Sequence, residues 1–355
     1  MNKLRWGILS TAGIARKNWR AIHDSGNSII AAVASREISR SGQFIQECQA
    51  IAAFESMPTA LGSYEELIAS PNVDAVYIPL PTGVRKKWVL HAAAAGKHVL
   101  CEKPCGLSLA DVQEMTDTCR KNNVQFMDGV MFMHNPRLQR IREVLDDGKS
   151  VGQIKRIMSV FSFATAEEFF GANIRVHSQL EPTGCLGDLG WYCLRFSLWA
   201  VNWQLPREVT GRILSQRGNS QSPAAAPTDF SGELIFDDVA SAGFYCSFLA
   251  EHQNWVHVGG AKGYLRVADF VHPLSVHEPV FEANQTGQRV KCCDCTAQHT
   301  DSRAMAQDSQ MFRNFANQVA TGKLNEDWPM WALKTQQVMD ACFESARQGG
   351  KSVNF

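Results

Sequence analysis

The first 130 residues alternate short apolar runs with stretches of helical periodicity, and this alternation leaves few folds open to the chain. Five runs are typical of buried strands: LRWGIL (4–9), SIIAAVAS (28–35), VDAVYIPL (73–80), HVLC (98–101) and VQFMDG (124–129). Helical patterns begin near Ile14, near Ser39, at the capping box Ser63-Tyr-Glu-Glu66, at residue 84 and after Ser108. Strands that alternate with helices of this length predict βαβ units in a parallel, doubly wound sheet.

After Pro136 the periodicity changes from mixed to mainly two-residue. A helix over about 137–147 precedes the alternating runs QIKRIMSVFSF, REVTGRILSQ, FSGELIFDD, SAGFYCSFLA and KGYLRVADF, which predict an open, largely antiparallel sheet with one buried face. The stretch SQSPAAAPT (220–228) is typical of an exposed loop, and helical patterns over about 302–321 and 330–348 close the chain.

The length of the chain favours more than one domain, because 355 residues exceed what one hydrophobic core usually holds. We therefore expect an α/β protein in three segments. They are a dinucleotide-binding domain over 1–128, an α+β domain for substrate and oligomerisation over 129–325, and a closing helix over 326–355.

Composition excludes several classes of protein. The formal net charge is zero, which gives no field to attract nucleic acid, and no apolar run approaches the roughly 20 residues of a membrane span. The N-terminus lacks the apolar core of a signal peptide, and eleven scattered cysteines in so long a chain favour reduced, buried thiols in the cytoplasm. The cluster Cys292, Cys293, Cys295 and His299 lacks the paired CxxC spacing of zinc sites, so we predict a strand edge there and no metal.

The first strand runs into a turn of small residues, GILSTAGIA (7–15). In doubly wound folds of the Rossmann type, ligands bind at the carboxyl ends of the strands, and this turn holds a phosphate group. Ser10 and Ala12 stand where a glycine-rich fingerprint has glycine, and any tight βα turn also needs small residues. Being small, they still let the backbone approach a pyrophosphate. The predicted cofactor contacts are Gly7, Ser10, Thr11, Ala12, Gly13, Ile14 and Ala15.

The end of the second strand indicates which dinucleotide binds. NAD-binding proteins place an acidic residue about 20 residues beyond the turn, where it bonds the ribose 2′-hydroxyl. Here the strand ends in Ser35-Arg36, and Arg40 follows one helical turn later. A guanidinium suits a phosphate, and serine can donate a hydrogen bond. The sequence therefore favours NADP over NAD, although an arginine after a strand can also be a solvated surface charge.

Four stretches together carry a resemblance to a known family. WGILSTAGIA, VASR, PLPTGVRKKWVLHAAAAGKHVLCEKP and GDLGWY occur in the order and spacing of the glucose–fructose oxidoreductase / inositol dehydrogenase family (Gfo/Idh/MocA), which this chain resembles from about residue 4 to 200. Within it the chain is most similar to the xylose-type sugar and dihydrodiol dehydrogenase branch, where a tyrosine follows the Asp-x-Gly motif. Members are mostly NAD(P)-dependent oxidoreductases of sugars, cyclitols and polyols.

The resemblance implies roles for particular residues. Lys103 would lie beside the nicotinamide and the reacting oxygen, on a turn held by Glu102 and directed by Pro104. Asp188 and Tyr192 would line the substrate pocket, with Tyr192 as proton donor or acceptor. Further implied contacts are Asn173 and Arg175 for the substrate, and Pro79, Leu80, Thr82, Arg85, Glu102 and Lys103 for the cofactor.

Three positions depart from the pattern of the family. Thr82 and Arg85 stand where many members have asparagine and histidine, and Met133 stands where many have arginine. These departures leave the cofactor expectation intact and leave the substrate open.

The chemistry of these residues suits dehydrogenation of an alcohol, which needs hydride loss from carbon and proton loss from oxygen. A free tyrosine ionises near pH 10, and a lysine ammonium beside it lowers that pKa, so Lys103 and Tyr192 could form a proton relay. Without the motif, Tyr192 would be typical of a core tyrosine and Asp188 of a helix N-cap. His134 and His177 are possible pocket residues that fit a structural role better.

The sequence thus predicts an NADP-dependent oxidoreductase of a sugar, polyol or related small molecule. It leaves open a non-enzymatic NADP-binding regulator, which would bind cofactor without turnover, and a glycosidase that uses a tightly held nicotinamide without net oxidation. An open sheet with an apolar outer face also predicts a homo-oligomer, a dimer or tetramer formed through that sheet.

Overall fold

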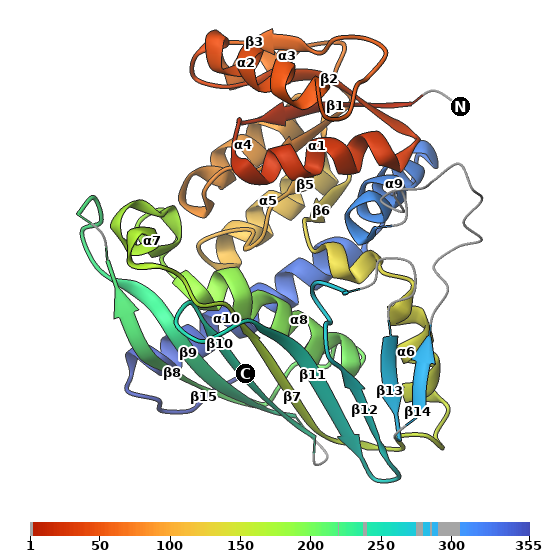
Figure 1. Ribbon diagram of the computed structural model, residues 1–355, viewed down its shortest axis with the longest axis vertical. Helices are drawn as coiled ribbons and strands as arrows, with labels where there is room; N and C mark the ends of the chain where they lie inside the picture. The colour runs from red at the N-terminus through yellow and green to blue at the C-terminus, as the bar shows by residue number, and fades with distance from the viewer. Residues whose placement is uncertain (1–2, 219, 237–239, 275–279, 285, 290–305) are drawn as a thin grey trace. The chain divides into compact units, whose positions relative to one another are not determined.

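A computed structural model describes residues 3–218, 220–236, 240–274, 280–284, 286–289 and 306–355 of the chain (Figure 1). The cluster Cys292, Cys293, Cys295 and His299 lies outside the described residues. The chain divides into two compact units. The first comprises Met1–Gly106, Ala110–Asn135 and Cys293–Ala332, and the second comprises Leu107–Leu109, Pro136–Cys292 and Leu333–Phe355.

The first unit confirms the predicted alternation of strands and helices. Its elements are β1 (Leu4–Leu9), α1 (Gly13–Ser25), β2 (Ser28–Ala34), α2 (Ile38–Gln49), β3 (Thr59–Leu61), α3 (Tyr64–Ala69), β4 (Ala75–Ile78), α4 (Thr82–Ala94), β5 (His98–Cys101), α5 (Leu109–Lys121), β6 (Phe126–Asp128) and α9 (Gln307–Ala320). All neighbouring strands are parallel, in the order β3-β2-β1-β4-β5-β6. This is the order of the doubly wound dinucleotide-binding sheet, and it puts the ends of β1, β2, β4 and β5 at one edge.

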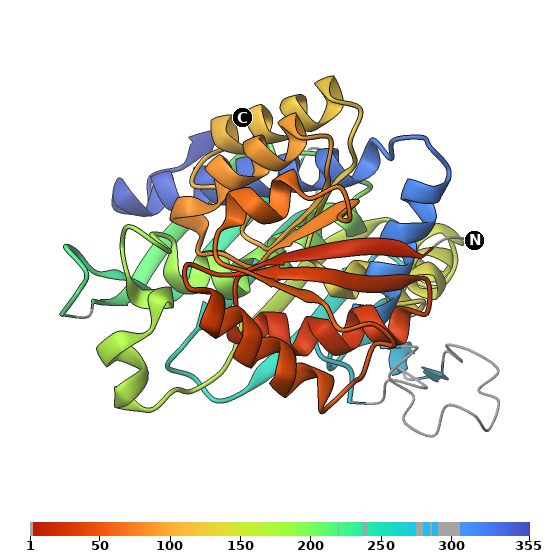
Figure 2. The ribbon, with the colours of Figure 1, turned by 90° about the horizontal axis from the view of Figure 1, so that it is seen from above.

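Helices cover both faces of this sheet, as the sequence of buried strands requires. Figure 2 shows α1 and α2 on one side of β1 and β2 and the helices drawn in orange on the other. Gly7 in β1 faces α3, where a Cβ atom would stand 2.4 Å from Leu67 Cδ2 and 3.1 Å from Val73 Cγ1. The glycine is therefore needed for close packing of β1 against α3, and it is buried rather than aimed at the turn.

This packing gives a stability prediction. Replacing Gly7 with alanine overpacks the interface with Leu67, so we expect the free energy of unfolding to fall by about 1–3 kcal/mol. Gly42 in α2 is the matched control, because a Cβ there meets nothing within 4 Å. Gly42→Ala should instead raise stability by about 0.5–1 kcal/mol, since alanine favours a helix interior over glycine. Urea unfolding of both variants checks the pair, and equal midpoints would contradict the packing assigned to Gly7.

The helix α9 corrects the expected domain boundaries. The boundaries at 128 and 325 assign this helix to the second domain, but its packing places it in the first unit. Its Phe312 ring lies 5.2 Å from the Trp6 ring and 5.7 Å from the Tyr77 ring, edge to face, and Phe315 lies 5.0 Å from Trp6. Trp6 and Tyr77 are fully buried, so the far end of the chain completes the core of the first sheet.

The second unit contains the predicted open sheet. Its elements are α6 (Arg137–Asp146), β7 (Ile154–Ser162), α7 (Glu167–Ala172), α8 (Trp191–Ala200), β8 (Glu208–Arg217), β9 (Ala226–Ile235), β10 (Ser241–Ser247), β11 (Gln253–Gly260), β12 (Tyr264–Val267), β13 (Val280–Ala283), β14 (Thr286–Arg289) and β15 (Val353–Asn354). The final helix α10 (Asp327–Arg347) contains the boundary between the units, after Ala332.

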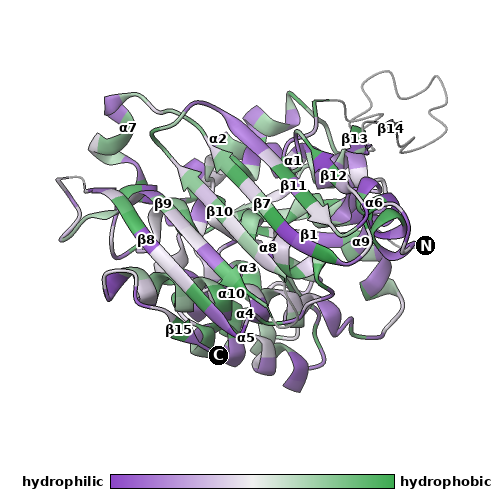
Figure 3. Ribbon diagram, turned by 90° about the horizontal axis from the view of Figure 1, so that it is seen from below, coloured by the Kyte–Doolittle hydropathy of each residue, from purple (hydrophilic) through white to green (hydrophobic). Residues whose placement is uncertain are grey.

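The nine strands of this sheet run in the order β14-β13-β12-β11-β7-β10-β9-β8-β15. Every pair is antiparallel except β7 with β10, so the sheet is largely antiparallel, as predicted. Hydrophobic and hydrophilic residues alternate along its central strands (Figure 3). In β7, Ser159 and Phe161 face α8, and Met158 and Val160 face the opposite side, because successive side chains point to opposite faces.

Two expectations for this unit are wrong. The stretch 220–228 is not a loop throughout, because Ala226, Pro227 and Thr228 are buried at the start of β9, and Ala226 and Pro227 pair with β8. A proline near the start of a strand loses only one ladder hydrogen bond, so its presence did not exclude a strand. The sequence also missed β11, whose buried Asn254 interrupts the apolar pattern.

The described thiols agree with the expectation drawn from the cysteine pattern. All eight described cysteines are buried and free: Cys48, Cys101, Cys105, Cys119, Cys185, Cys193, Cys246 and Cys342. Among the described residues, no helix combines the length and apolar character that a membrane crossing requires.

Candidate functional site

The turn after β1 has the strained backbone that a phosphate-binding loop tolerates. Ser10 adopts φ 139°, in a region that side-chain-bearing residues rarely enter, and its Oγ accepts a hydrogen bond of 3.1 Å from Ala12 N–H. Such a backbone conformation costs on the order of 1–3 kcal/mol, and residues that adopt it occur often at functional sites. It also explains why a glycine fingerprint has glycine at this position.

The helix α1 begins directly after this turn and has no side-chain cap. Ala12 is the N-cap residue, and a Cβ on Gly13 would meet no protein atom within 4 Å. Thr11 and Ala12 are half-buried, Gly13 and Ile14 are exposed, and Ala15 is buried in the packing of the helix. The predicted cofactor residues Ser10 to Ile14 are thus at least partly exposed at a helix N-terminus, with open space at Gly13, whereas Gly7 and Ala15 pack inside the unit.

The end of β2 separates the roles of its serine and its arginines. Ser35 is buried, and its hydroxyl donates to Glu37 O at 2.6 Å and accepts from the Ser41 hydroxyl at 3.0 Å. Ser35 therefore builds the start of α2. Arg36 and Arg40 are exposed, and within the described part of the chain neither guanidinium makes a hydrogen bond or an ion pair.

A tyrosine that the sequence did not single out lies beside these two arginines. Burial raises the pKa of Tyr64, while the charges of Arg36 and Arg40 act to lower it. The Tyr64 ring packs edge to face on Trp88 of α4 at 4.9 Å. Two unpaired guanidinium groups beside an aromatic residue form an electropositive place for an anion at the end of β2.

A buried carboxylate, that of Glu102, stabilises the turn after β5 through hydrogen bonds. Glu102 Oε1 accepts from Tyr77 Oη at 2.6 Å, Tyr77 Oη accepts from Asn18 Nδ2 at 2.6 Å, and Lys103 N–H donates to Glu102 Oε2 at 3.3 Å. Burial and the neighbouring carboxylate raise the pKa of Tyr77 well above its usual value, so the phenol keeps its proton as a donor to Glu102. Lys103 is half-buried and precedes a cis peptide bond to Pro104. The structure thus shows Glu102 holding the turn that carries Lys103.

Arg85 fixes the same turn from α4. It is 3% exposed, its Nε donates to Leu80 O at 2.7 Å, and its Nη1 donates to Glu102 O at 2.8 Å and to Pro104 O. Pro79, Leu80 and Thr82 are buried beside it. The guanidinium is occupied by main-chain oxygens of two loops, so the structure gives it a scaffolding role, and direct cofactor contact by these four residues stays a prediction.

The second unit brings Asp188 and Tyr192 together on a tightly packed helix start. Leu186–Gly190 forms a π-helical turn that leads into α8. Gly190 of the Asp-x-Gly motif packs against β10, since a Cβ there would stand 2.9 Å from Leu186 Cδ1 and 3.2 Å from Cys246 Sγ. Asp188 lies inside the π-helical turn and is therefore not the N-cap of α8. Single π-helical turns are frequent at functional sites.

Arg175 is the ion-pair partner of Asp188. Its Nε donates to Asp188 Oδ2 at 2.8 Å, and the negative charge of Asp188 is the main reason that the pKa of Arg175 is raised, with smaller contributions from Glu181 and Tyr192. Asn173 Oδ1 accepts from Arg175 N–H at 3.0 Å and caps the short 3₁₀ helix Ile174–Val176. Four predicted site residues of the second unit, Asn173, Arg175, Asp188 and Tyr192, therefore form one group.

Two further residues join this group that the sequence did not single out. The Phe161 ring of β7 lies edge to face on Tyr192 at 5.5 Å and on His272 at 5.7 Å. Asn254 fixes the loop that carries His272, since its Oδ1 accepts from Val271 N–H and His272 N–H, each at 3.2 Å. Sequence periodicity could place Phe161 on the inner face of β7 but gave no signal for His272, which depends on contacts with a distant strand.

The other candidate residues have structural partners. His177 Nδ1 accepts from Gln179 N–H at 3.2 Å, and His134 Nδ1 lies 3.2 Å from Asn314 Nδ2. Met133 is half-buried next to His134. No group of three or more potential metal ligands occurs among the described residues.

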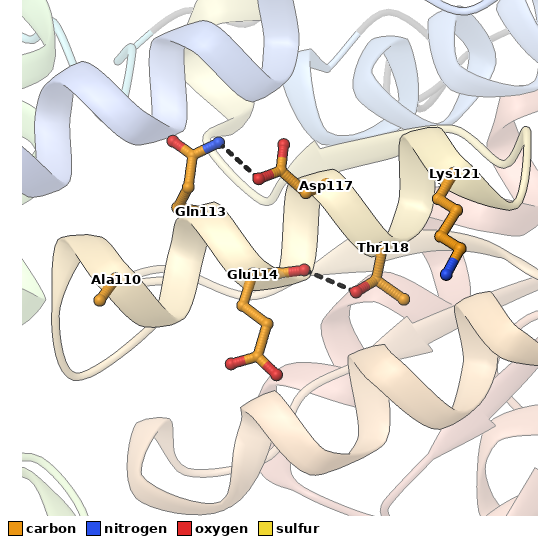
Figure 4. Close-up of a pocket in the computed structure, with 6 residues that line it drawn as sticks. All are labelled: Ala110, Gln113, Glu114, Asp117, Thr118 and Lys121. Atoms are coloured by element: carbon orange, nitrogen blue, oxygen red, sulfur yellow. Dashed lines mark hydrogen bonds between the residues drawn. The ribbon is translucent and has the colours of Figure 1, made fainter.

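A surface hollow on the first unit contains none of the predicted site residues. It is lined by residues of α5: Ala110, Gln113, Glu114, Asp117, Thr118 and Lys121 (Figure 4). Its hydrogen bonds join neighbours on the same helix, from Gln113 Nε2 to Asp117 Oδ2 at 2.9 Å and from Thr118 Oγ1 to Glu114 O at 2.7 Å. This is a solvated helix face, with no strand end and no buried polar group directed at a ligand.

The order of the parallel sheet and the strained turn after β1 are those of a dinucleotide-binding fold. Residues 4–130 match the oxidoreductase family with an NAD-binding Rossmann fold, Gfo/Idh/MocA, and residues 138–266 match the C-terminal domain of that family. The chain belongs to the Gfo/Idh/MocA family and is an NAD(P)-dependent oxidoreductase.

Similar proteins agree with the branch that the sequence indicated. The chain is 31% identical over 278 residues to a trans-1,2-dihydrobenzene-1,2-diol dehydrogenase of Mus musculus, which covers 77% of each chain. It is 30% identical over 349 residues to a D-xylose 1-dehydrogenase (NADP(+)) of Haloferax volcanii, which covers 98% of each.

Solved structures show the same fold at lower identity. An aldose–aldose oxidoreductase from Caulobacter crescentus, complexed with glycerol, superposes with a TM-score of 0.83 at 20% identity and covers both chains completely. A 3-ketoreductase from Actinomadura kijaniata, in complex with NADP and TDP-benzene, superposes with a TM-score of 0.80 at 21% identity, over 97% of this chain and 98% of its own.

Proposed function

We propose that the protein transfers hydride between NADP(H) and a carbonyl or hydroxyl group of a sugar, polyol or related polyhydroxylated small molecule. The observation that carries the proposal is the Lys103 turn, which Glu102 and Arg85 hold at the carboxyl end of β5. In an oxidoreductase of this fold that edge of the sheet is where ligands bind. Relatives named for a xylose and for a dihydrodiol support this class of substrate.

The residues of the first unit fit an NADP molecule. Open space at Gly13 and the uncapped start of α1 suit a pyrophosphate, because helix N-terminal N–H groups attract anions. Arg36 and Arg40 suit a 2′-phosphate, because they are exposed and have no partner among the described residues. An NAD-type site would carry a carboxylate at this strand end.

The protein residues would hold and move the proton of the reaction. Bound NADP(H) would supply or accept the hydride at the reacting carbon. In the reductive direction, Tyr192 would give its phenolic proton to the substrate oxygen, and Lys103 would stabilise the phenolate that remains. In oxidation the phenolate would take the hydroxyl proton. Asn173 and Asp188 would orient the other hydroxyl groups of the substrate.

The direct test is an assay of nicotinamide absorbance with aldoses, ketoses and vicinal diols, each with NADP(H) and with NAD(H). We expect turnover with NADP(H) and at least one polyhydroxylated compound. Cofactor binding without turnover on the whole panel would contradict the proposal and indicate a regulator instead. Cleavage of a glycoside with no net change in absorbance would indicate the glycosidase alternative.

The outer face of the nine-stranded sheet favours a homo-oligomer. Val160 of β7 pairs with Tyr245 of β10 on one side and with Trp255 of β11 on the other, and these three side chains lie on the face opposite Phe161. They form an apolar row across three adjacent strands, which a second copy of the chain would cover. Sedimentation equilibrium should give a dimer or tetramer, and a monomer mass at micromolar concentration would contradict this part of the proposal.

Because the eight described cysteines are buried and free, we also expect the protein to work in the reducing cytoplasm.

A further inference from the structure

The guanidinium of Arg175 binds a carboxylate through its Nε atom. Its Nε lies 2.8 Å from Asp188 Oδ2, and Asn173 holds the backbone of Arg175 by accepting its N–H at 3.0 Å. The Arg175 side chain is 44% exposed and that of Asp188 is 17% exposed, so the pair lies at the border between core and solvent. A bond between a guanidinium and a carboxylate in such a place is strong and directional.

This pair lies close enough to Tyr192 for their charges to interact. The charge of a tyrosinate at Tyr192 is one of the smaller causes that raise the pKa of Arg175. Asp188, in the π-helical turn, stands four residues before Tyr192 of α8, and its negative charge would oppose a phenolate if it stood alone. The charge of Glu181 also acts on Arg175. His272 and Tyr192 both contact the Phe161 ring.

We propose that Arg175 is a positioning residue of the reaction: its ion pair with Asp188 cancels the charge of that carboxylate and so lets Tyr192 exchange its proton near neutral pH. This inference rests on the proposed function, because it assigns Arg175 a role in the proton step of Tyr192. It also reassigns Arg175 from the substrate contact expected from the sequence to an internal partner of Asp188. In this arrangement Asp188 orients hydroxyl groups and is not itself the acid or base.

The test is the pH profile of kcat/KM in the oxidative direction, whose rising limb reports the ionisation of Tyr192. Arg175→Gln should move this limb to higher pH by about one unit, because it removes the positive charge and leaves Asp188 unpaired. Asp188→Asn should move the limb to lower pH, because Arg175 then acts alone. The double variant Arg175→Gln/Asp188→Asn should return the limb to within a few tenths of a unit of the parent, since the two charges are removed together.

A purely structural role for Arg175 gives a different result. In that case Arg175→Gln would lower activity at every pH with the limb in place, and the second substitution would lower it further. Arg175→Lys keeps the charge and should keep the limb near its original position, which makes the test usable if Arg175→Gln folds poorly. Either an unmoved limb in Arg175→Gln or a moved limb in Arg175→Lys overturns the proposal.

A second measurement needs no turnover. The chain has five tyrosines, and burial raises the pKa of three of them, Tyr64, Tyr77 and Tyr245. In an ultraviolet titration, the tyrosinate signal that is lost in Tyr192→Phe therefore belongs to Tyr192. Arg175→Gln should move this signal to higher pH. If Tyr192→Phe leaves turnover intact, the proposed function fails. If Tyr192 is needed for turnover but neither limb nor signal moves in Arg175→Gln, only the present inference fails.

Discussion

Replacing Tyr192 with phenylalanine should lower kcat by about 10²- to 10⁴-fold, the usual contribution of one general acid or base. The substitution removes only the hydroxyl group. The phenylalanine ring can keep the edge-to-face contact with Phe161 at 5.5 Å, and the site is buried, so the fold and the binding of NADP should not change. The KM of the substrate should change by much less than kcat, because the lost interaction forms mainly in the transition state.

Tyr245→Phe is the matched control for this loss. Tyr245 also lies in the second unit, but on β10 and on the outer face of the sheet, beside Val160. Tyr245→Phe should leave kcat within about twofold of the parent value, because Tyr245 takes no part in the proton step. Equal activity of Tyr192→Phe and the parent enzyme, measured with saturating NADP(H) and the best substrate of the panel, would remove Tyr192 from the reaction.

The second large effect concerns the choice of cofactor. Arg36→Ala and Arg40→Ala should each weaken NADP binding by about 10- to 100-fold, since a hydrogen bond to a charged group contributes about 1.5–3 kcal/mol. Affinity for NAD, which lacks the 2′-phosphate, should stay within about threefold. Both arginines are exposed and have no partner among the described residues, so their removal should not change stability.

Titration calorimetry or fluorescence with both dinucleotides checks this expectation. Arg140→Ala is the control, because Arg140 is a half-exposed arginine of α6 in the second unit whose ion-pair partner among the described residues is Glu143 of its own helix. It should leave both affinities unchanged. A parallel loss of NADP and NAD affinity in Arg36→Ala would mean that the arginine supports the fold of the site rather than the 2′-phosphate.

Local patterns explain why much of the first unit could be predicted. The strand HVLC and the Ser63 cap depend on neighbours in sequence, and the structure confirms both, with Ser63 Oγ accepting from Glu66 N–H at 3.2 Å. The assignment of α9 to the first unit could not be predicted, because Trp6 and Phe312 meet from positions about 300 residues apart. Periodicity finds an apolar helix face and does not say which sheet will cover it.

The candidate site likewise combines residues that local patterns predict with contacts that only the tertiary fold determines. The motif residues Lys103, Asp188 and Tyr192 could be proposed from the sequence because their spacing is characteristic of a family. The turn after β1 could be proposed because parallel strands bind ligands at their ends. The partners of these residues were missed. Glu102 needs Tyr77 and Asn18 from other elements, Arg85 turns inward to main-chain oxygens, and the loop of His272 is held by a buried Asn254. Each of these contacts joins segments that only the tertiary fold brings together.

The central claim is that Lys103 and Tyr192 act as one proton-transfer unit, and a double-mutant cycle tests it most directly. The cycle compares kcat/KM of the parent, Lys103→Met, Tyr192→Phe and the double variant with NADP(H) and one substrate. Residues that act as a unit give non-additive losses, so the double variant should be no more than about threefold slower than the slower single variant. Losses that multiply, with the double variant slower by the product of the two single effects, would show that the residues act independently and would contradict the relay.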